Sequence, residues 1–118
     1  MTSKNDIRWV GKDKIVFGLK DIHIKLIQSV FSSYSGVDKA VIYGSRAKGN
    51  YSTGSDIDFT LKGEDINLST LLKIENELDD LLLPYKIDLS IFHKIEDPDL
   101  IEHINRVGII FYEKNRAY

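Results

Sequence analysis

Apolar and polar residues alternate along this chain with spacings that change from one segment to the next. Apolar residues that return every three or four positions are typical of a helix with one buried face. That spacing predicts helices at about 20–34, 69–82 and 97–107. The last of them has the clearest bounds, because Asp97 can cap it, Pro98 suits its first turn and Gly108 ends it.

Short apolar or alternating segments between these helices predict strands. They lie at 40–43, 57–61, 86–92 and 109–112. The resulting order is helix, strand, strand, helix, strand, helix, strand, which is typical of a small α+β or α/β sheet with helices packed on it. The 118 residues favour a single domain over 1–118, with a core at about 17–113 and an irregular extension at 1–16.

The strand alternation also predicts where polar side chains gather, because alternate residues of a strand point to opposite faces. Asp56 and Asp58 fall on the face opposite to the apolar residues of 57–61. Asp88 is placed in the same way in the segment 86–92. If these two strands are neighbours with their apolar faces aligned, the three carboxylates converge on one polar surface.

Converging carboxylates repel one another and raise each other's pKa unless a cation lies between them. Oxygen donors of this kind suit Mg²⁺ or Mn²⁺, which complete their shells with water and substrate phosphates. Two such ions can clamp the attacking and leaving oxygens of an in-line displacement at phosphorus. Asp56, Asp58 and Asp88 are therefore the candidate catalytic and metal-binding residues.

The segment before these aspartates, GSRAKGNYSTGS, supplies groups that suit phosphate. Gly44 and Ser45 follow a strand and open a turn that can begin a short helix, whose free N–H groups attract anions. Arg46 and Lys48 are candidates for neutralising a phosphate tail, and a surface salt bridge is the alternative for Arg46. The segment predicts a nucleotide whose phosphates lie beside the metal-binding carboxylates.

Three parts of the sequence together resemble a known family: Gly44-Ser45-Arg46-x-x-Gly49, then Ser55-Asp56-x-Asp58, then Asp88 within KIDL. This pattern resembles the DNA polymerase β-like nucleotidyltransferase superfamily. Within it, the chain looks like the minimal nucleotidyltransferases of the MntA type, encoded beside HEPN-domain partners. The resemblance implies a small mixed sheet with helices on one face, like the palm of polymerase β, and adds Ser55 to the nucleotide-binding residues Gly44, Ser45 and Arg46.

The resemblance also implies a reaction, in which AMP passes from ATP to a hydroxyl group with two Mg²⁺ ions as cofactors. Asp56 and Asp58 would hold both ions, and Asp88 would complete the ion nearer the acceptor. By analogy the acceptor is a tyrosine of a HEPN-type toxin, which makes this chain an antitoxin that acts by AMPylation. Two alternatives stay open: a catalytically silent antitoxin that occludes its partner, and nucleotidylation of an RNA end or a small molecule.

The composition of the chain argues against several other classes of protein. The formal charge of −2 argues against direct binding of nucleic acid, and the absence of cysteine excludes disulfides and thiolate metal sites. No apolar run approaches the roughly 20 residues of a membrane span, so a cytoplasmic protein is expected. His23, His93 and His103 lack metal-ligand spacing and are interpreted as structural or surface residues, and a homo-oligomer stays open.

Overall fold

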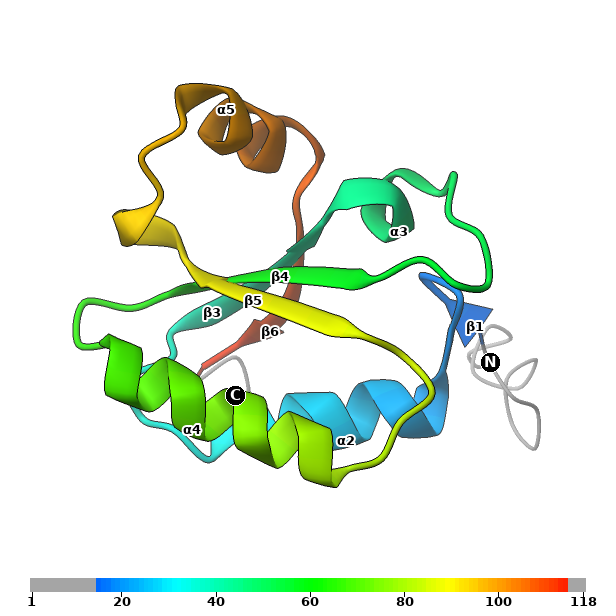
Figure 1. Cartoon of the computed structure of the whole chain (residues 1–118), viewed down its shortest axis with the longest axis horizontal. Coiled ribbons are helices and arrows are strands. Elements are labelled where there is room, and N and C mark those ends of the chain that lie inside the picture. The colour runs from blue at the N-terminus through cyan, green and yellow to red at the C-terminus, as the bar shows by residue number, and fades with distance from the viewer. Residues whose placement is uncertain (1–14, 115–118) are drawn as a thin grey trace, which may run out of the picture.

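The protein is described by a computed structural model covering residues 15–114. It contains a two-stranded hairpin, a four-stranded sheet and the helices around them (Figure 1). In chain order the elements are β1 (Ile15–Val16), β2 (Leu19–Lys20), α2 (Asp21–Ser32), β3 (Lys39–Tyr43), α3 (Gly44–Lys48), β4 (Ile57–Lys62), α4 (Leu68–Asp80), β5 (Ile87–Ile91), a 3₁₀ turn η1 (Phe92–Lys94), α5 (Pro98–Val107) and β6 (Ile109–Glu113).

The four-stranded sheet has the order β5-β4-β3-β6. β3 pairs antiparallel with both β4 and β6, whereas β4 and β5 run parallel. The sheet is therefore mixed, as expected, and each strand predicted from the alternation is present within about one residue of its predicted bounds. The parallel pair is joined through α4, because parallel strands need a crossover connection.

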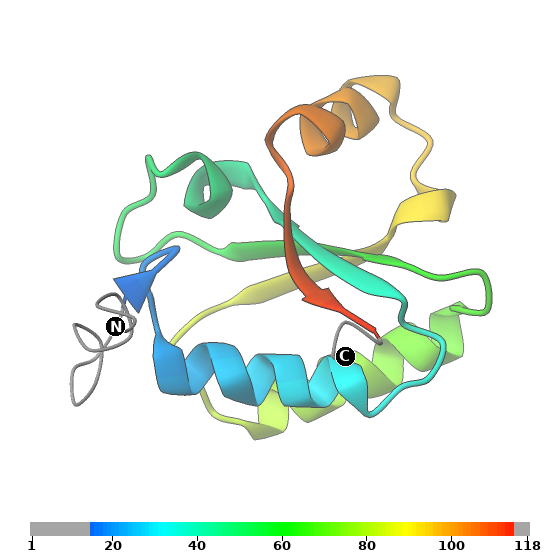
Figure 2. The same cartoon turned by 180° about the vertical axis from the view of Figure 1, so that it is seen from behind.

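Two layers of helices enclose the sheet. α2 and α4 lie side by side against one face, and α3 and α5 lie on the other side (Figures 1 and 2). The core lies under α2 and α4, where Ile57, Phe59 and Leu61 of β4 are each 0% exposed. The expectation of helices on one face thus holds for the two long helices only, since α5 packs Ile104, 2% exposed, on the opposite side.

A small hairpin precedes α2 and lies partly within the segment that was expected to be irregular. Its strands pair antiparallel, Val16 opposite Leu19, around a turn at Phe17 and Gly18. Both turn residues have positive φ, 60° and 73°, as a type I′ turn requires. Phenylalanine is an uncommon residue at such a φ, so the sequence lacks the usual Asn-Gly signal of this turn.

None of the helices within residues 15–114 combines the length and the hydropathy needed to cross a membrane.

Candidate active site

The parallel pairing of β4 with β5 brings two of the predicted carboxylates together. Asp58 and Asp88 occupy directly opposite positions in the register. Tyr43 lies opposite Asp58 on the other side, at the end of β3. Asp56 stands immediately before β4, half-buried, and its charge acts on Asp58. The neighbouring strands and aligned faces that the alternation required are therefore confirmed.

Asp58 is the electrostatic centre of this group. Burial raises the pKa of the Asp58 carboxyl, and the negative charges of Asp88 and Asp56 raise it further. A side-chain hydrogen bond with Asp88 acts in the same direction, while His103 acts in the opposite one. The ionised form of Asp58 is thus disfavoured by its surroundings, which is the condition that a bound cation relieves.

The donor set fits Mg²⁺ or Mn²⁺ in its chemistry, since it consists of carboxylate oxygens on one strand face. Within residues 15–114, no three or more His, Cys, Asp or Glu side chains are already gathered in an arrangement that holds a metal ion. The aspartates therefore stand as neighbours around Asp58 without forming a closed cluster.

The phosphate-binding turn predicted at Gly44 and Ser45 lies directly beside these carboxylates. α3 begins at Gly44, immediately after β3, and ends at Gly49 in the left-handed conformation. Gly44 has a φ of 74°, and a Cβ there would collide with Oδ2 of Asp58. Glycine is therefore required twice at this position, by the backbone and by the approach of the carboxylate.

Two further side chains belong to this site and were not predicted from the sequence. The rings of Tyr43 and His103 meet edge to face, with centroids 6.1 Å apart. Burial chiefly raises the pKa of the Tyr43 hydroxyl; a hydrogen bond with Ser90 lowers it and the charges of Asp58 and Asp88 raise it. His103 was interpreted as a structural or surface residue, and its charge acts on Asp58.

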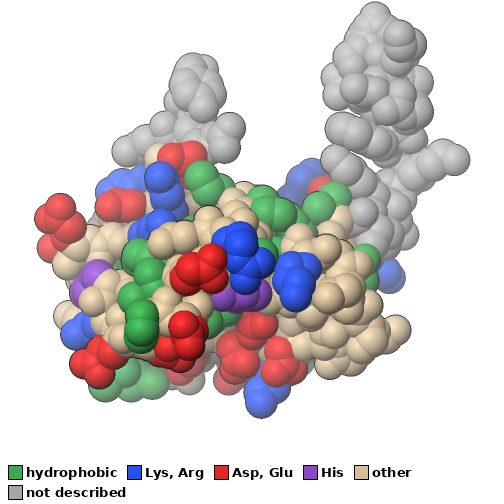
Figure 3. Space-filling view, turned by 90° about the horizontal axis from the view of Figure 1, so that it is seen from above, with side chains coloured by type: hydrophobic (Ala, Val, Ile, Leu, Met, Phe, Trp, Pro, Cys, Tyr) green, Lys and Arg blue, Asp and Glu red, His purple; other side chains and the backbone are tan. Residues whose placement is uncertain are grey.

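The surface view agrees with this arrangement. Figure 3 shows a group of acidic side chains with a histidine beside it, on the side of the molecule that carries α3 and α5.

Arg46 is buried and held by backbone carbonyl oxygens. Its side chain is 2% exposed, and its guanidinium donates to the carbonyl oxygens of Ser55, Phe17 and Thr53. Within residues 15–114 this side chain forms no salt bridge, and its contact with phosphate stays a prediction. It extends from α3 towards the N-terminal hairpin and the loop that follows α3.

Ser55 is also engaged in a turn. Its hydroxyl oxygen accepts the N–H of Ser52 at 2.9 Å, and its own N–H donates to the Ser52 carbonyl at 3.1 Å. These bonds close the loop immediately before Asp56. Among the predicted nucleotide-binding residues, Gly44 lies at the Asp58 carboxylate and Ser45 follows it in α3, whereas Arg46 and Ser55 shape the loop between α3 and β4.

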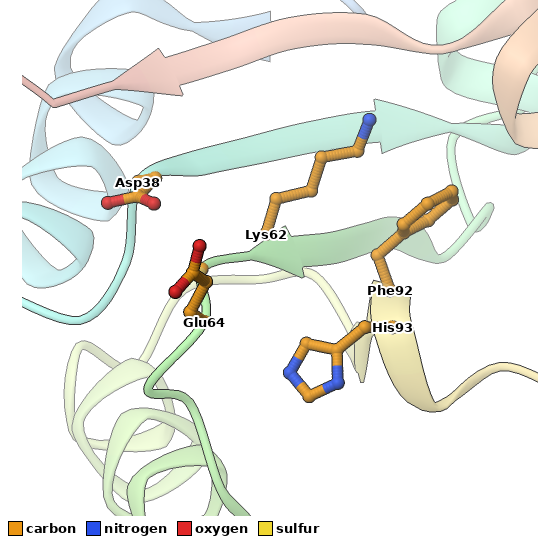
Figure 4. A pocket seen from close by; sticks show the side chains of 6 residues that line it. Asp38, Lys62, Glu64, Phe92 and His93 are labelled. Atoms are coloured by element: carbon orange, nitrogen blue, oxygen red, sulfur yellow. The ribbon is translucent and has the colours of Figure 1, made fainter.

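An open pocket of about 400 Å³ lies at the other end of β4 (Figure 4). Asp38, Lys62, Glu64, Phe92 and His93 line it, and Lys62 Nζ stands 4.4 Å from the centre of the Phe92 ring. The pocket is separated from Asp58 by the length of the strand. Its two acidic residues, Asp38 and Glu64, come from different loops, and none of the three predicted aspartates lines it. It is therefore not the site of the predicted chemistry.

Comparison with known proteins identifies the family. Residues 25–117 match the profile of the family described as polymerase beta, nucleotidyltransferase. The chain belongs to the polymerase beta nucleotidyltransferase family. The match includes the Gly44 turn and all three aspartates, so the predicted nucleotidyltransferase class and fold are confirmed. No curated protein matches the sequence.

Solved structures with this nucleotidyltransferase fold include chains of toxin–antitoxin complexes. A toxin–antitoxin complex with AMP-PNP aligns at a TM-score of 0.64 and 16% identity, over 79% of this chain and 75% of that one. A mutant MntA-HpeT toxin–antitoxin complex aligns at a TM-score of 0.60 and 14% identity, over 80% of this chain and 75% of that one. A tri-AMPylated HEPN toxin of Shewanella oneidensis with its MNT antitoxin aligns at 0.58 and 13%, over 80% and 73%.

Proposed function

We propose that this protein transfers AMP from ATP to a tyrosine hydroxyl of a HEPN-type toxin and thereby acts as its antitoxin. The observation that carries the proposal is the pairing of Asp58 with Asp88 beside the glycine turn that opens α3. Carboxylates and a phosphate-binding turn in contact are what nucleotidyl transfer needs. The structural neighbours support the choice of substrate and partner, because one contains AMP-PNP and another an AMPylated HEPN toxin.

Each site residue has a role in this proposal. Gly44 and Ser45 bind the β- and γ-phosphates through the N–H groups at the start of α3. Asp56 and Asp58 would hold two Mg²⁺ ions, and Asp88 would share one of them. When bound, these ions supply charge neutralisation at the phosphates and at the developing oxyanion. Asp88 receives the proton of the acceptor hydroxyl as its oxygen bonds to the α-phosphorus.

The atoms balance in a single displacement. The tyrosine oxygen forms a bond to the α-phosphorus, the bond between that phosphorus and the bridging oxygen to the β-phosphate breaks, and pyrophosphate leaves. One of the neighbouring structures is a mutant in which two aspartates with one residue between them are replaced by glutamate. Asp56 and Asp58 have the same spacing, which supports placing the reaction at this pair.

The test uses ATP labelled at the α-phosphate, Mg²⁺, this protein and the product of the adjacent gene. Asp58→Asn is run beside the wild type, with Asp80→Asn as an exposed aspartate on α4 that serves as the matched control. We expect label on the partner with the wild type and with Asp80→Asn, and none with Asp58→Asn.

Other outcomes point to other functions. If a variant with Asn at Asp56, Asp58 and Asp88 still neutralises the partner, the protein acts by occluding its partner and not as an enzyme. Label on an RNA end or a small molecule in the absence of any partner protein would keep the chemistry and change the acceptor.

A further inference from the structure

Arg46 is a buried cation with an unusual set of partners. Within residues 15–114, none of the ion pairs includes it. Its Nε and Nη2 both donate to the carbonyl oxygen of Ser55, at 3.1 Å and 2.8 Å. The rings of Tyr51 and Tyr85 lie 5.3 Å and 5.4 Å from its Cζ. A guanidinium this deeply buried is retained by carbonyl oxygens and aromatic faces in place of a carboxylate.

The carbonyl that takes two of these bonds belongs to the residue immediately before Asp56. Arg46 itself lies on α3, two residues after Gly44. One guanidinium therefore connects the turn proposed to bind phosphate with the strand entry that carries a proposed metal ligand. The intervening residues 49–54 are exposed, and the Arg46 bonds and the Ser52–Ser55 turn help to hold this loop on the protein, together with the bonds from the N–H groups of Gly49 and Asn50 to the Ser45 carbonyl.

The third bond of Arg46 reaches the N-terminal hairpin. Nη1 donates to the carbonyl oxygen of Phe17 at 2.9 Å. A Cβ at the next residue, Gly18, would lie 2.5 Å from Cε1 of Tyr51 and 2.7 Å from Nη1 of Arg46. The hairpin turn is thus seated directly on the guanidinium, beside the loop that follows α3 (Figures 1 and 2). It lies before residue 25, where the family match begins.

We propose that Arg46 is a positioning residue that holds Asp56 in register with the phosphate turn, and that the β1–β2 hairpin completes this support from outside the family-matched segment. The inference rests on the proposed function, because it assigns Asp56 to metal binding. Arg46 acts through the Ser55 backbone and touches neither substrate nor metal. Tyr85 is itself fixed, since its hydroxyl lies 3.0 Å from Nδ1 of His23 on α2.

The test measures binding of Mn²⁺ alone, from the free-ion signal in electron paramagnetic resonance, and needs neither acceptor nor transfer. Arg46→Lys keeps the charge and removes the planar fork that serves one carbonyl twice. Gly18→Ala keeps Arg46 and displaces the hairpin from it. We expect Mn²⁺ binding to weaken about tenfold in Arg46→Lys and severalfold in Gly18→Ala, as for other residues that orient a metal ligand.

Two controls match these variants. Arg106→Lys makes the same substitution at an exposed arginine that pairs with Glu102 on α5. Gly49→Ala imposes a comparable positive φ, 88°, where a Cβ meets nothing within 4 Å. Both controls are expected to bind Mn²⁺ like the wild type. Hydrogen exchange of amides 50–56, measured on the same samples, is expected to accelerate in Arg46→Lys and Gly18→Ala and to stay unchanged in Arg106→Lys.

The outcomes separate this inference from the proposed function. Mn²⁺ binding equal to the wild type in both variants, with only the melting temperature lowered, would overturn the positioning role and leave the proposed function standing. Unchanged Mn²⁺ binding with weakened binding of an ATP analogue would show that Arg46 binds phosphate and does not position Asp56. A wild type that binds no Mn²⁺ would overturn both. If Arg46→Lys does not fold, Gly18→Ala still decides the result.

Discussion

The two faces of β4 differ sharply in burial and charge. On one face Ile57, Phe59 and Leu61 are fully buried under α2 and α4. On the other, Asp58 faces Asp88 and Tyr43, and its pKa is raised by burial and by like charges. A single alternation of residues therefore divides the strand into a side that stabilises the fold and a side that is held in place at a cost in stability.

The largest effect is expected on the polar face. Asp58→Asn is expected to lower AMP transfer about a thousandfold or more, or about 4 kcal/mol of activation free energy, because it removes a ligand shared by both metal ions. In metal-free protein at neutral pH the same change is expected to raise the melting temperature by a few degrees. The raised pKa means that folding disfavours the ionised carboxyl above its unfolded pKa, and asparagine removes that charge.

Initial rates with labelled ATP and thermal unfolding with and without Mg²⁺ check this pair of expectations. The wild type is expected to gain stability on addition of Mg²⁺, and Asp58→Asn to gain less. A variant that is less stable than the metal-free wild type would show that Asp58 supports the fold, and the contrast between the faces would fail.

Phe59→Ala changes the opposite face of the same strand. Phe59 is 0% exposed, and its ring lies 4.7 Å from that of Phe111 and 5.2 Å from that of Phe31, measured between centroids. Loss of this ring is expected to lower the free energy of unfolding by about 3–5 kcal/mol through lost burial and the cavity left behind. Urea denaturation measures the change, with the half-exposed Leu72→Ala as control. A loss below about 1 kcal/mol would contradict the assigned core.

The division between faces could be predicted from the sequence, because strand periodicity fixes which residues share a face. It placed Asp56, Asp58 and Asp88 together, and the capping signals of Asp97 and Gly108 gave the bounds of α5. What periodicity does not give is the direction of a long side chain on a helix as short as α3. The bonds of Arg46 to the carbonyl oxygens of Thr53 and Ser55 therefore could not be predicted from the sequence.

Contacts between distant segments were likewise beyond the sequence. The hairpin at 15–20 has a Phe-Gly turn without the usual glycine or asparagine at its first position, and it is seated by a residue far along the chain. His103 reaches Asp58 only because α5 crosses the polar face, which no local pattern states. The elements were predictable because they depend on local spacing, whereas these contacts depend on how the elements pack.

Gly44 lies where β3 ends and α3 begins, next to the Asp58 side chain on the polar face of β4. Gly44→Ala combines a φ of 74° with a collision at Oδ2 of Asp58, so about 1–3 kcal/mol of stability is expected to be lost. Transfer is expected to fall further than stability explains, because the carboxylate is displaced. Gly49→Ala, at a φ of 88° in open space, isolates the backbone part. Both variants are measured well below their melting temperatures. Equal activity in the two would show that the collision with Asp58 does not cause the loss of transfer.

The smallest effect sharpens the comparison through a second raised pKa. The Tyr34 hydroxyl, at the end of α2, donates a hydrogen bond to Glu77 of α4 beneath the apolar face. That bond, followed by burial and the Glu77 charge, raises the pKa of Tyr34 to about 12. Here the pKa is raised because the protonated hydroxyl forms a favourable hydrogen bond in the folded protein. That bond stabilises the fold fully below pH 10, and the stabilisation is lost as the pH rises towards 12.

Tyr34→Phe is therefore expected to lower the free energy of unfolding slightly at pH 8, and the difference from the wild type is expected to shrink as the pH approaches 12. Urea denaturation of both proteins at a series of pH values measures that difference. The exposed setting of the pair keeps the effect small, because solvent screens it. A difference that grows with pH would mean that the phenolate is favoured in the fold. We expect the raised pKa to reflect a destabilising charge at Asp58 and a stabilising hydrogen bond at Tyr34. A difference that grows with pH would contradict this contrast.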